Sequence, residues 1–225
     1  MKRRVDDRKL IERRLPTILA AAAEAFASRG YHLTTMQDVA KCAEVSVGMI
    51  YQYVEDKQDL LYLVIEEVVS AYEVEIERNE CLAAEPLERF VALLSGLSTV
   101  VVAHKAAARL GYREASQLRR DRLEQIKARE RSLAELVARR VAACVESGDF
   151  PPVDETMLAY LCLISIQSWP VSAWRLDRQI TPDEYLARGL RVLLGGLVPW
   201  ERLAPLIEGS PAAQARGEAK QRKSA

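Results

Sequence analysis

The sequence has little histidine and no cysteine pair that is close enough for a structural metal site. Its only histidines are His32 and His104, and no C-x-x-C pair occurs. The four cysteines are widely spaced: Cys42, Cys81, Cys144 and Cys162. A structural zinc site needs four closely spaced ligands. We therefore expect four reduced thiols that pack as small apolar residues, and we expect neither a metal nor a cofactor.

Long apolar runs are missing, and so is an excess of charge of either sign. The longest uninterrupted apolar run, Met157 to Ile164, is far shorter than the ~20 residues that a membrane-spanning helix needs. The N-terminus is basic but lacks the apolar segment of a secretion signal. The 32 Lys and Arg balance 32 Asp and Glu, so the chain has no global field typical of a nucleic-acid coat. These absences predict a cytoplasmic protein with no membrane segment.

Glycine and proline are scarce as well. The 225 residues include only 10 Gly and 9 Pro, and no proline lies between Pro16 and Pro86. Apolar residues recur at steps of three and four along most of the chain, which is the periodicity of helices with one buried face. The sequence therefore predicts an all-α fold.

The first strong helical pattern begins at Leu15. Pro16 suits the first turn of that helix, where its missing N–H would be unpaired anyway, and Gly30 is a candidate to end it. The preceding residues 2–14 carry seven Lys or Arg against three acidic residues. We expect a mobile basic arm at residues 1–11, or else a frayed extension of the helix.

Residues Gln37 to Val54 fit two short helices joined by a tight turn. Thr35 and Ser46 are the expected N-caps, since both side chains can accept a hydrogen bond from the first turn. A helix-turn-helix needs a small residue where its helices cross, which Ala40 supplies. The inward positions are Val39, Ala43, Val45, Ile50 and Tyr53.

The second short helix has an outward face that would fit the major groove of DNA. That face consists of Val47, Gly48, Met49 and Gln52. Tyr51 and Lys57 flank it as candidates for phosphate contacts. A hairpin of two helices with the same caps and no DNA partner would show the same spacing, so the spacing alone leaves both interpretations open.

The stretch from Ile18 to Val64 has the pattern AA…F…GY…T…VA..A.VS.G.IY.Y…K.DLL. In this order and spacing it resembles the N-terminal domain of TetR-family transcriptional regulators. The resemblance implies a three-helix helix-turn-helix domain and a larger C-terminal helical domain for ligand binding and dimerisation. It also implies a homodimer on a palindromic double-stranded DNA operator, usually acting as a repressor that a small molecule releases.

The resemblance also implies roles for individual residues. Thr35, Gln37, Val47, Gly48 and Gln52 would approach bases, Ser46 would belong to the same DNA-binding surface, and Tyr51, Tyr53 and Lys57 would contact phosphates. Tyr51 could instead pack in the core, and Gly48 could serve a close contact between helices. Glu44 departs from the family pattern, which commonly has glycine in this turn. A left-handed backbone there would cost Glu44 about 1 kcal/mol, unless the turn differs.

The predicted organisation has five parts. A basic arm at residues 1–11 precedes a helix-turn-helix domain at residues 12–56 and a connecting helix at residues 57–79. The ligand-binding and dimerisation domain follows at residues 80–208. Residues 209–225 contain no large apolar side chain beyond the last helix, and we expect them to be disordered.

Two helices near the C-terminus carry the expected dimer interface. The first, residues 154–174, is apolar on nearly every side between Met157 and Ile166, so it is expected to be buried all round. The second, residues 181–194, begins with Thr181 as its N-cap. It presents Leu186, Leu190, Leu193 and Leu194 at helical steps. Two copies of each helix would form a four-helix bundle.

Three segments of the C-terminal half, Leu110–Ser116, Trp169–Leu176 and Thr181–Tyr185, resemble TetR-family members that sense acyl-CoA thioesters. Such a ligand needs an apolar slot and cations for its phosphates. The candidate ligand-binding residues are Arg109, Tyr112, Arg113, Glu114, Trp169, Trp174 and Arg175, and Arg119 and Arg120 are further available cations. A solvated helix face would explain the arginines equally well, and a core or a dimer interface would explain the tryptophans.

Other functions fit the sequence less well. No GxSxG, GxxxxGK[ST], GxGxxG or HExxH motif occurs, which argues against an enzyme. A helical scaffold that binds only proteins stays open until salt-dependent binding to a palindromic duplex is tested. A multidrug or xenobiotic sensor of the same fold is the alternative to an acyl-CoA sensor. It would need a broad aromatic and acidic pocket, and the C-terminal half contains few aromatic residues.

Overall fold

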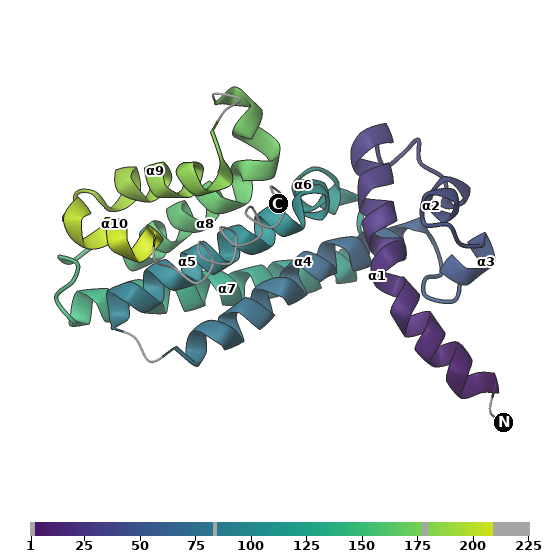
Figure 1. Ribbon diagram of the computed structural model, residues 1–225, viewed down its shortest axis with the longest axis horizontal. Helices are drawn as coiled ribbons and strands as arrows, with labels where there is room; N and C mark the ends of the chain where they lie inside the picture. The colour runs from purple at the N-terminus through teal and green to yellow at the C-terminus, as the bar shows by residue number, and fades with distance from the viewer. Residues whose placement is uncertain (1–2, 83–84, 177–179, 209–225) are drawn as a thin grey trace, which may run out of the picture. The chain divides into compact units, whose positions relative to one another are not determined.

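A computed structural model describes residues 3–82, 85–176 and 180–208 of the chain (Figure 1). Every regular element in these three ranges is a helix, and none of them contains a strand. The predicted all-α fold is therefore confirmed. The tail expected at residues 209–225 lies outside the described residues.

The chain forms two compact units whose boundaries differ from the expected ones. The first unit runs to Val68 and also contains Lys105–Ile126. The second unit contains Val69–His104 and the chain from Lys127 onward. The sequence pattern places residues 105–126 in the C-terminal domain, because local periodicity cannot show that this segment packs against the first helix of the chain.

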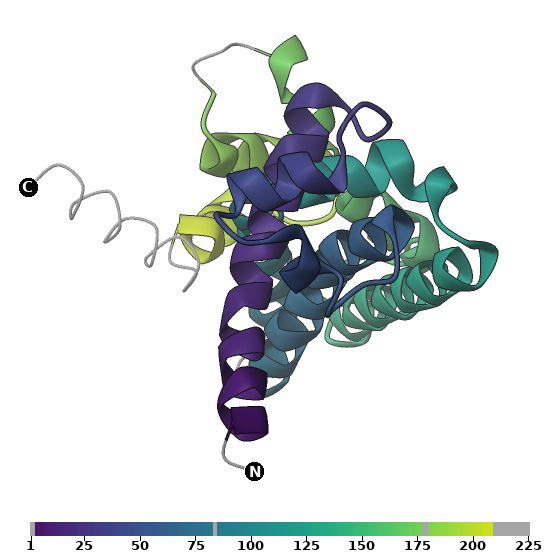
Figure 2. The same ribbon diagram turned by 90° about the vertical axis from the view of Figure 1, so that its right-hand side faces the viewer.

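The first unit packs a long N-terminal helix against a short helix and a helix from the middle of the chain, and a second short helix packs against the first short one (Figure 2). Its elements are α1 (Arg3–Arg29), α2 (Met36–Cys42), α3 (Val47–Ile50), the first part of α4 (Lys57–Glu80), α6 (Lys105–Glu114), the 3₁₀ turn η1 (Ala115–Gln117) and the start of α7 (Arg120–Glu146). Helix α1 contacts both α2 and α6. Ile18, Phe26, Ile50 and Leu60 are fully buried in the core of this unit. Burial of one such side chain stabilises a fold by about 1.5–3 kcal/mol.

Helix α1 begins earlier than the sequence pattern predicts. A start at Leu15 with Pro16 in the first turn is wrong, because the helix begins at Arg3 and encloses Pro16. Proline removes one backbone donor and clashes with the carbonyl four residues earlier, which kinks a helix. Figure 1 shows α1, in purple, changing direction between its first turns and the remainder. The basic residues from Arg3 onward therefore lie on a helical extension, and Gly30 follows the helix with a φ of 89°, as a C-cap glycine should.

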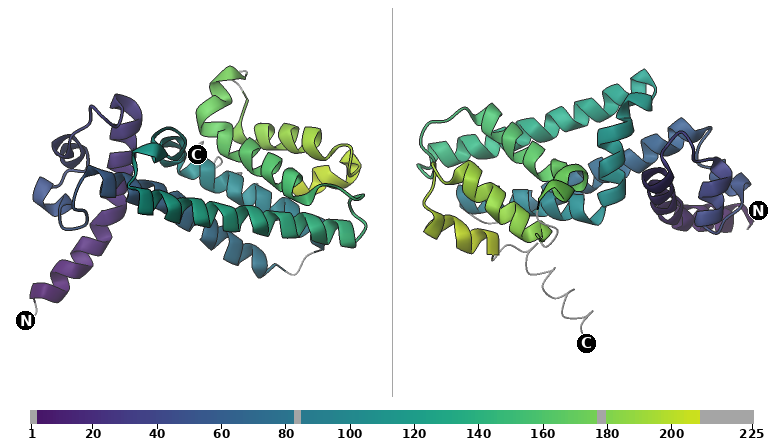
Figure 3. Two further views of the ribbon diagram at one scale, coloured as in Figure 1. Left: turned by 180° about the vertical axis from the view of Figure 1, so that it is seen from behind. Right: turned by 90° about the horizontal axis from the view of Figure 1, so that it is seen from above.

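The second unit is built around α5 (Pro86–Ala103), which packs mainly against the three helices near the C-terminus (Figure 3). Its other elements are α8 (Glu155–Ser172), the 3₁₀ turn η2 (Ala173–Arg175), α9 (Pro182–Leu194), α10 (Trp200–Glu208) and the remaining parts of α4 and α7. Phe90, Leu93 and Leu94 of α5 are completely buried. Helix α5 is long and apolar enough to cross a membrane, but more than half of it is buried inside the unit, as in the core helix of a soluble protein.

Helix α8 is not buried all round in the single chain, contrary to the expectation for residues 157–166. Leu158, Cys162 and Ile166 are buried, whereas Met157 and Tyr160 are 52% and 56% exposed. The helix has too many apolar residues for one unit to cover, so one of its sides stays uncovered. The N-terminal cap of this helix is Asp154, whose Oδ1 accepts a hydrogen bond from the backbone N–H of Met157 at 2.9 Å.

Helix α9 uses its leucines inside its own unit. Leu186, Leu190 and Leu194 are buried there, and Leu193 is half-buried. The expectation that these leucines form the dimer interface is therefore wrong for the three buried ones, because a side chain that already packs in its own core cannot reach a partner. Val192 on the same helix is 82% exposed. The predicted cap of α9 is confirmed, since Thr181 and Glu184 form a capping box.

Candidate nucleic-acid interface

Helices α2 and α3 form the helix-turn-helix that the sequence predicts, with both predicted caps. Thr35 Oγ1 accepts a hydrogen bond from the backbone N–H of Asp38 at 3.2 Å, and Asp38 Oδ2 accepts one from the backbone N–H of Thr35 at 2.9 Å. The hydrogen bonds from Thr35 hold the pKa of Asp38 below its usual value. Ser46 Oγ accepts from the backbone N–H of Met49 at 3.2 Å. Each cap of this kind contributes about 1 kcal/mol to helix stability.

The turn between α2 and α3 brings the two helices together through small and apolar residues. The backbone N–H of Val45 donates to the carbonyl of Ala40 at 3.0 Å, and Ala40 is buried as predicted. Glu44 has a φ of 54°, so it adopts the left-handed conformation that glycine commonly supplies in this turn. The turn therefore keeps its usual geometry at the expense of backbone strain in Glu44.

We predict that Glu44→Gly raises the free energy of unfolding by about 0.5–1 kcal/mol, because glycine adopts this φ without a Cβ clash. Urea denaturation of the two proteins measures the difference. Glu44→Ala serves as the control, since alanine loses the carboxylate but keeps the Cβ, and it should not stabilise the protein. A glycine variant less stable than the wild type would contradict the strain at Glu44.

Most of the residues predicted to contact bases lie on the open face of the helix-turn-helix. Thr35, Gln37, Ser46, Gly48 and Gln52 are exposed, and Val47 is half-buried. A Cβ added at Gly48 would meet only Ser46 Oγ, at 4.0 Å, so this glycine does not serve a close contact between helices. This face is free to approach a large partner.

The tyrosines predicted to contact phosphates differ in their surroundings. Tyr51 is 51% exposed, so it does not pack in the core. Tyr53 is half-buried, as its inward position predicts, and burial raises the pKa of its phenol above the usual value. The Tyr53 hydroxyl therefore remains protonated at neutral pH and can donate a hydrogen bond.

Lys57, the remaining predicted phosphate contact, is bound within the first unit. Its ammonium lies 3.0 Å from the backbone oxygen of Tyr31, 3.3 Å from that of His32 and 3.1 Å from that of Thr34. It also lies 4.5 Å from the centre of the Tyr31 ring. Lys57 is therefore already bound by groups of the protein, unlike the exposed residues around it.

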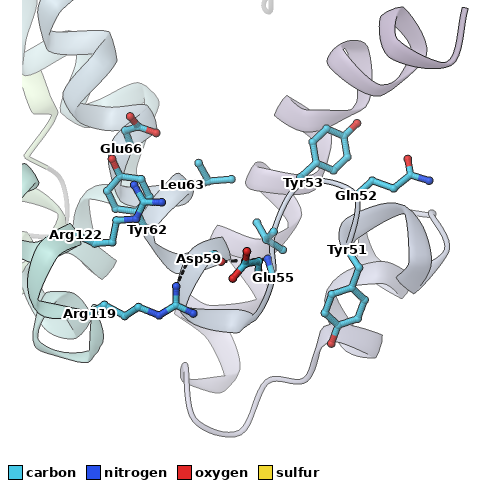
Figure 4. Close-up of a pocket in the computed structure, with 11 residues that line it drawn as sticks. Tyr51, Gln52, Tyr53, Glu55, Asp59, Tyr62, Leu63, Glu66, Arg119 and Arg122 are labelled. Atoms are coloured by element: carbon cyan, nitrogen blue, oxygen red, sulfur yellow. Dashed lines mark hydrogen bonds and ion pairs between the residues drawn. The ribbon is translucent and has the colours of Figure 1, made fainter. Parts of the chain in front are cut away.

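A groove of about 650 Å³ lies beside the segment that leaves α3 (Figure 4). One wall is the segment from Tyr51 to Glu55. The opposite wall consists of Asp59, Tyr62, Leu63 and Glu66 of α4 together with Arg119 and Arg122. The groove thus has carboxylates and guanidinium groups on the same wall.

Arg119 joins two carboxylates at the start of α4. Its Nη2 donates to Asp56 Oδ2 at 2.5 Å and its Nη1 donates to Asp59 Oδ1 at 3.1 Å. Asp56 Oδ1 meanwhile accepts the backbone N–H groups of Gln58 and Asp59 and so caps α4. These backbone bonds, together with the Arg119 charge, hold the pKa of Asp56 below its usual value. Arg119, expected as an available cation for a ligand, is thus already paired.

The seven residues predicted to bind a ligand belong to different units. Arg109, Tyr112, Arg113 and Glu114 lie on α6 in the first unit, where all but Glu114 are exposed. In the second unit, Trp169 lies 4.9 Å from the ring of Tyr185, so it packs between α8 and α9. Trp174 is 73% exposed, and Arg175 lies over its ring at 5.2 Å. None of the seven lines the groove of the first unit or the cavity of the second unit described next.

The second unit contains a cavity of about 270 Å³ that sequence reasoning missed. Its floor is apolar and consists of Val69, Tyr72, Ile76, Leu133 and Leu136 from α4 and α7. Its rim is charged and consists of Glu73, Arg129, Glu130 and Arg139. Arg129 forms two hydrogen bonds of 2.7 Å with Glu73, and its Nη2 also reaches Ser70. On each helix these residues follow the ordinary pattern of an amphipathic helix, so no signal in the sequence marks them.

The thiols and carboxylates that the structure describes do not gather into a metal site. Among the residues in the three described ranges, no group of three or more His, Cys, Asp or Glu could hold a metal ion. Burial raises the pKa of the Cys144 and Cys162 thiols to about 12, so both stay protonated at neutral pH. Cys42 and Cys81 are exposed and free.

Both halves of the chain match models of known protein families. Residues 18–63 match the model described as bacterial regulatory proteins of the tetR family. Residues 83–197 match the model described as the tetracyclin repressor-like C-terminal domain. The two matches cover the helix-turn-helix and most of the remaining chain.

Individual proteins resemble the chain over most of its length. The HTH-type transcriptional regulator HbdR of Aromatoleum sp. (strain CIB) is 35% identical over 190 residues, which are 84% of this chain and 83% of that protein. A tetR-family regulatory protein from Rhodococcus RHA1 is 25% identical with a TM-score of 0.69, covering 82% of this chain and 97% of that chain. AibR in complex with isovaleryl coenzyme A and operator DNA has a TM-score of 0.67 at 20% identity, covering 80% of this chain and 97% of that chain. The fold of this chain is therefore shared with solved regulators.

Proposed function

Since the chain belongs to the tetR family of bacterial regulatory proteins, we propose that it represses transcription as a homodimer bound to a palindromic operator. As a member of this family the chain is a ligand-responsive transcriptional regulator and not an enzyme, and it needs no cofactor. We further propose that it acts in the cytoplasm and that an acyl-CoA thioester releases it from DNA.

The exposed face of the helix-turn-helix carries the proposal of operator binding. In this motif the second helix lies in the major groove, and its N-terminal residues contact base edges. Val47 and Gly48 form the first turn of α3, and Gln52 follows it, all on the open face. This surface has few donors, so we expect readout through thymine methyl groups and through Gln37 or Gln52 to adenine. Tyr51 and Tyr53 are the proposed phosphate contacts of this segment.

Uncovered apolar side chains in the second unit support the proposed homodimer through helices 154–174 and 181–194. Met157, Tyr160 and Leu161 on α8 and Val192 on α9 are exposed in the single chain. Apolar patches of this kind mark protein interfaces. A second copy that covers α8 and α9 would complete a four-helix bundle, and its two-fold symmetry would match a palindromic operator.

The cavity of the second unit supports an effector with an apolar chain. Its floor of Val69, Tyr72 and Leu133 suits an acyl group, and Arg139 is an exposed cation at its rim. Arg175 of the same unit is exposed and remains a proposed partner for anionic groups of the effector. AibR, which shares the fold, binds isovaleryl coenzyme A. An effector releases the protein only if it binds the DNA-free conformation more tightly than the DNA-bound one.

One titration series tests the operator and the effector together. A duplex selected by the protein from a random library is titrated at several salt concentrations, with and without CoA thioesters, their free acids, CoA alone and an aromatic cation. We expect a palindromic site, an affinity that falls steeply with salt, and weaker DNA binding with a thioester. No preferred duplex at physiological salt would contradict operator binding. A free acid or an aromatic cation that binds more tightly than every thioester would reject the acyl-CoA effector alone.

A further inference from the structure

Lys57 is the first residue of α4, and its side chain reaches back to the connection between α1 and α2. Three backbone oxygens of this connection, those of Tyr31, His32 and Thr34, lie within 3.0–3.3 Å of its ammonium. An ammonium group has three donors and no acceptor. The three carbonyls therefore match the complete donor set of Lys57.

The same connection is held by other contacts that converge on Thr34. Thr34 is 1% exposed, and its Oγ1 donates to the backbone oxygens of Gly30 and Ala25 at 2.8 and 3.2 Å. The Tyr31 ring packs edge-on against Phe26, with ring centres 5.2 Å apart, and carries the Lys57 ammonium on its face. The connection is thus tied to α1 through Thr34 and Phe26, and to α4 through Lys57.

The connection between α1 and α2 positions the amino end of α2. Thr35, the N-cap of α2, directly follows the carbonyl of Thr34 that Lys57 binds. Thr35 and Gln37 are both exposed and are both proposed to approach bases. Without the Lys57 ammonium, the partly buried carbonyls of Tyr31 and Thr34 would lose this donor, and buried backbone groups without a partner are costly. The start of α2 would then be free to shift.

We propose that Lys57 is a positioning residue that holds the amino end of α2 against DNA and that it binds no phosphate itself. A phosphate contact would require the ammonium to leave at least one of these carbonyls, because all three of its donors are already engaged. The inference rests on the proposed binding of operator DNA. It replaces the role that the resemblance implied for this lysine.

The test compares Lys57→Met with Lys41→Met in the full chain. Methionine keeps an unbranched side chain of similar size and removes the ammonium. Lys41 is exposed at the end of α2. Its variant therefore measures how the loss of one lysine charge from the helix-turn-helix changes the affinity for DNA. Each protein is titrated with the selected operator between about 50 and 300 mM salt, a roughly sixfold range of counterion concentration.

We expect Lys57→Met to weaken operator binding about tenfold at every salt concentration, as the loss of charged hydrogen bonds predicts. The slope of log K against log salt should change by less than about 0.3, whereas loss of a phosphate contact lowers it by about 0.9. The variant Lys57→Arg also distinguishes a positioning role from a phosphate contact. Arginine binds phosphate well but cannot match three converging carbonyls, so it should bind DNA as poorly as the methionine variant.

Hydrogen exchange without DNA gives a readout that does not depend on the operator. At a temperature well below unfolding, amides of residues 33–38 should exchange about tenfold faster in Lys57→Met, while those of α5 stay unchanged. A slope lowered by about one unit, or full affinity in Lys57→Arg, would overturn the proposal. So would unchanged exchange at residues 33–38. A wild-type protein that prefers no duplex would contradict the proposed function. The hydrogen-exchange result would then still test whether Lys57 holds the amino end of α2.

Discussion

Replacing Leu190 by glutamate is expected to unfold the second unit, whereas the same change at Val192 is expected to leave the fold intact and to abolish the proposed dimer. Leu190 is 2% exposed in its own chain, and a carboxylate there would be buried without a partner. Such a charge costs several kcal/mol, a large part of a typical stability of about 5–15 kcal/mol. Val192 is 82% exposed, and a surface change of this kind alters stability by about 0.5 kcal/mol or less.

Chemical denaturation and sedimentation measure the two effects separately. Leu190→Glu should lose cooperative unfolding or unfold at low urea, and Val192→Glu should unfold like the wild type but sediment as a monomer. The monomer should no longer hold a palindromic operator, because it engages only one half-site. Tyr160→Glu on α8, 56% exposed, should behave like Val192→Glu if both helices share the interface. Dimers of Val192→Glu and Tyr160→Glu at micromolar concentration would place the interface elsewhere.

Gly48→Leu is expected to abolish the proposed operator binding without destabilising the protein. Space in front of Gly48 is open, since an added Cβ would meet only Ser46 Oγ at 4.0 Å. Leucine also favours a helix by up to about 1 kcal/mol relative to glycine, so the melting temperature should stay or rise slightly. A bulky side chain on the reading helix would keep the backbone of α3 away from the base edges. We expect a loss of affinity of at least about 100-fold, because several base contacts of about 1–3 kcal/mol each are lost together.

Gly196→Leu is the matched control for this change. Gly196 is exposed after α9, and nothing lies within 4 Å of a Cβ added there. Its variant should bind the operator like the wild type. Thermal melting compares the stability of the two leucine variants, and operator titration compares their affinity for DNA. Wild-type affinity in Gly48→Leu would mean that the face of α3 does not approach DNA.

Short-range features of this protein follow from its sequence because their partners lie within a few residues. The caps at Thr35, Ser46 and Thr181 each need only a side-chain oxygen and an N–H group three residues later, and all three occur as predicted. The positive φ of Gly30 and the left-handed Glu44 are likewise local properties of a helix end and a tight turn. The spacing of apolar residues in the same way predicts helices throughout.

The partners of long side chains, and the faces that stay uncovered, were decided only by the tertiary structure. Lys57 binds carbonyls 23 to 26 residues earlier, and Arg119 pairs with carboxylates 60 and 63 residues earlier, so spacing could not show that either cation is already engaged. Leu190 and Val192 are both apolar and only two residues apart on α9, yet one packs in the core and the other faces solvent. Periodicity tells which residues share a face of a helix. Which face meets the core depends on the other helices that pack there, and those contacts join residues far apart in the chain.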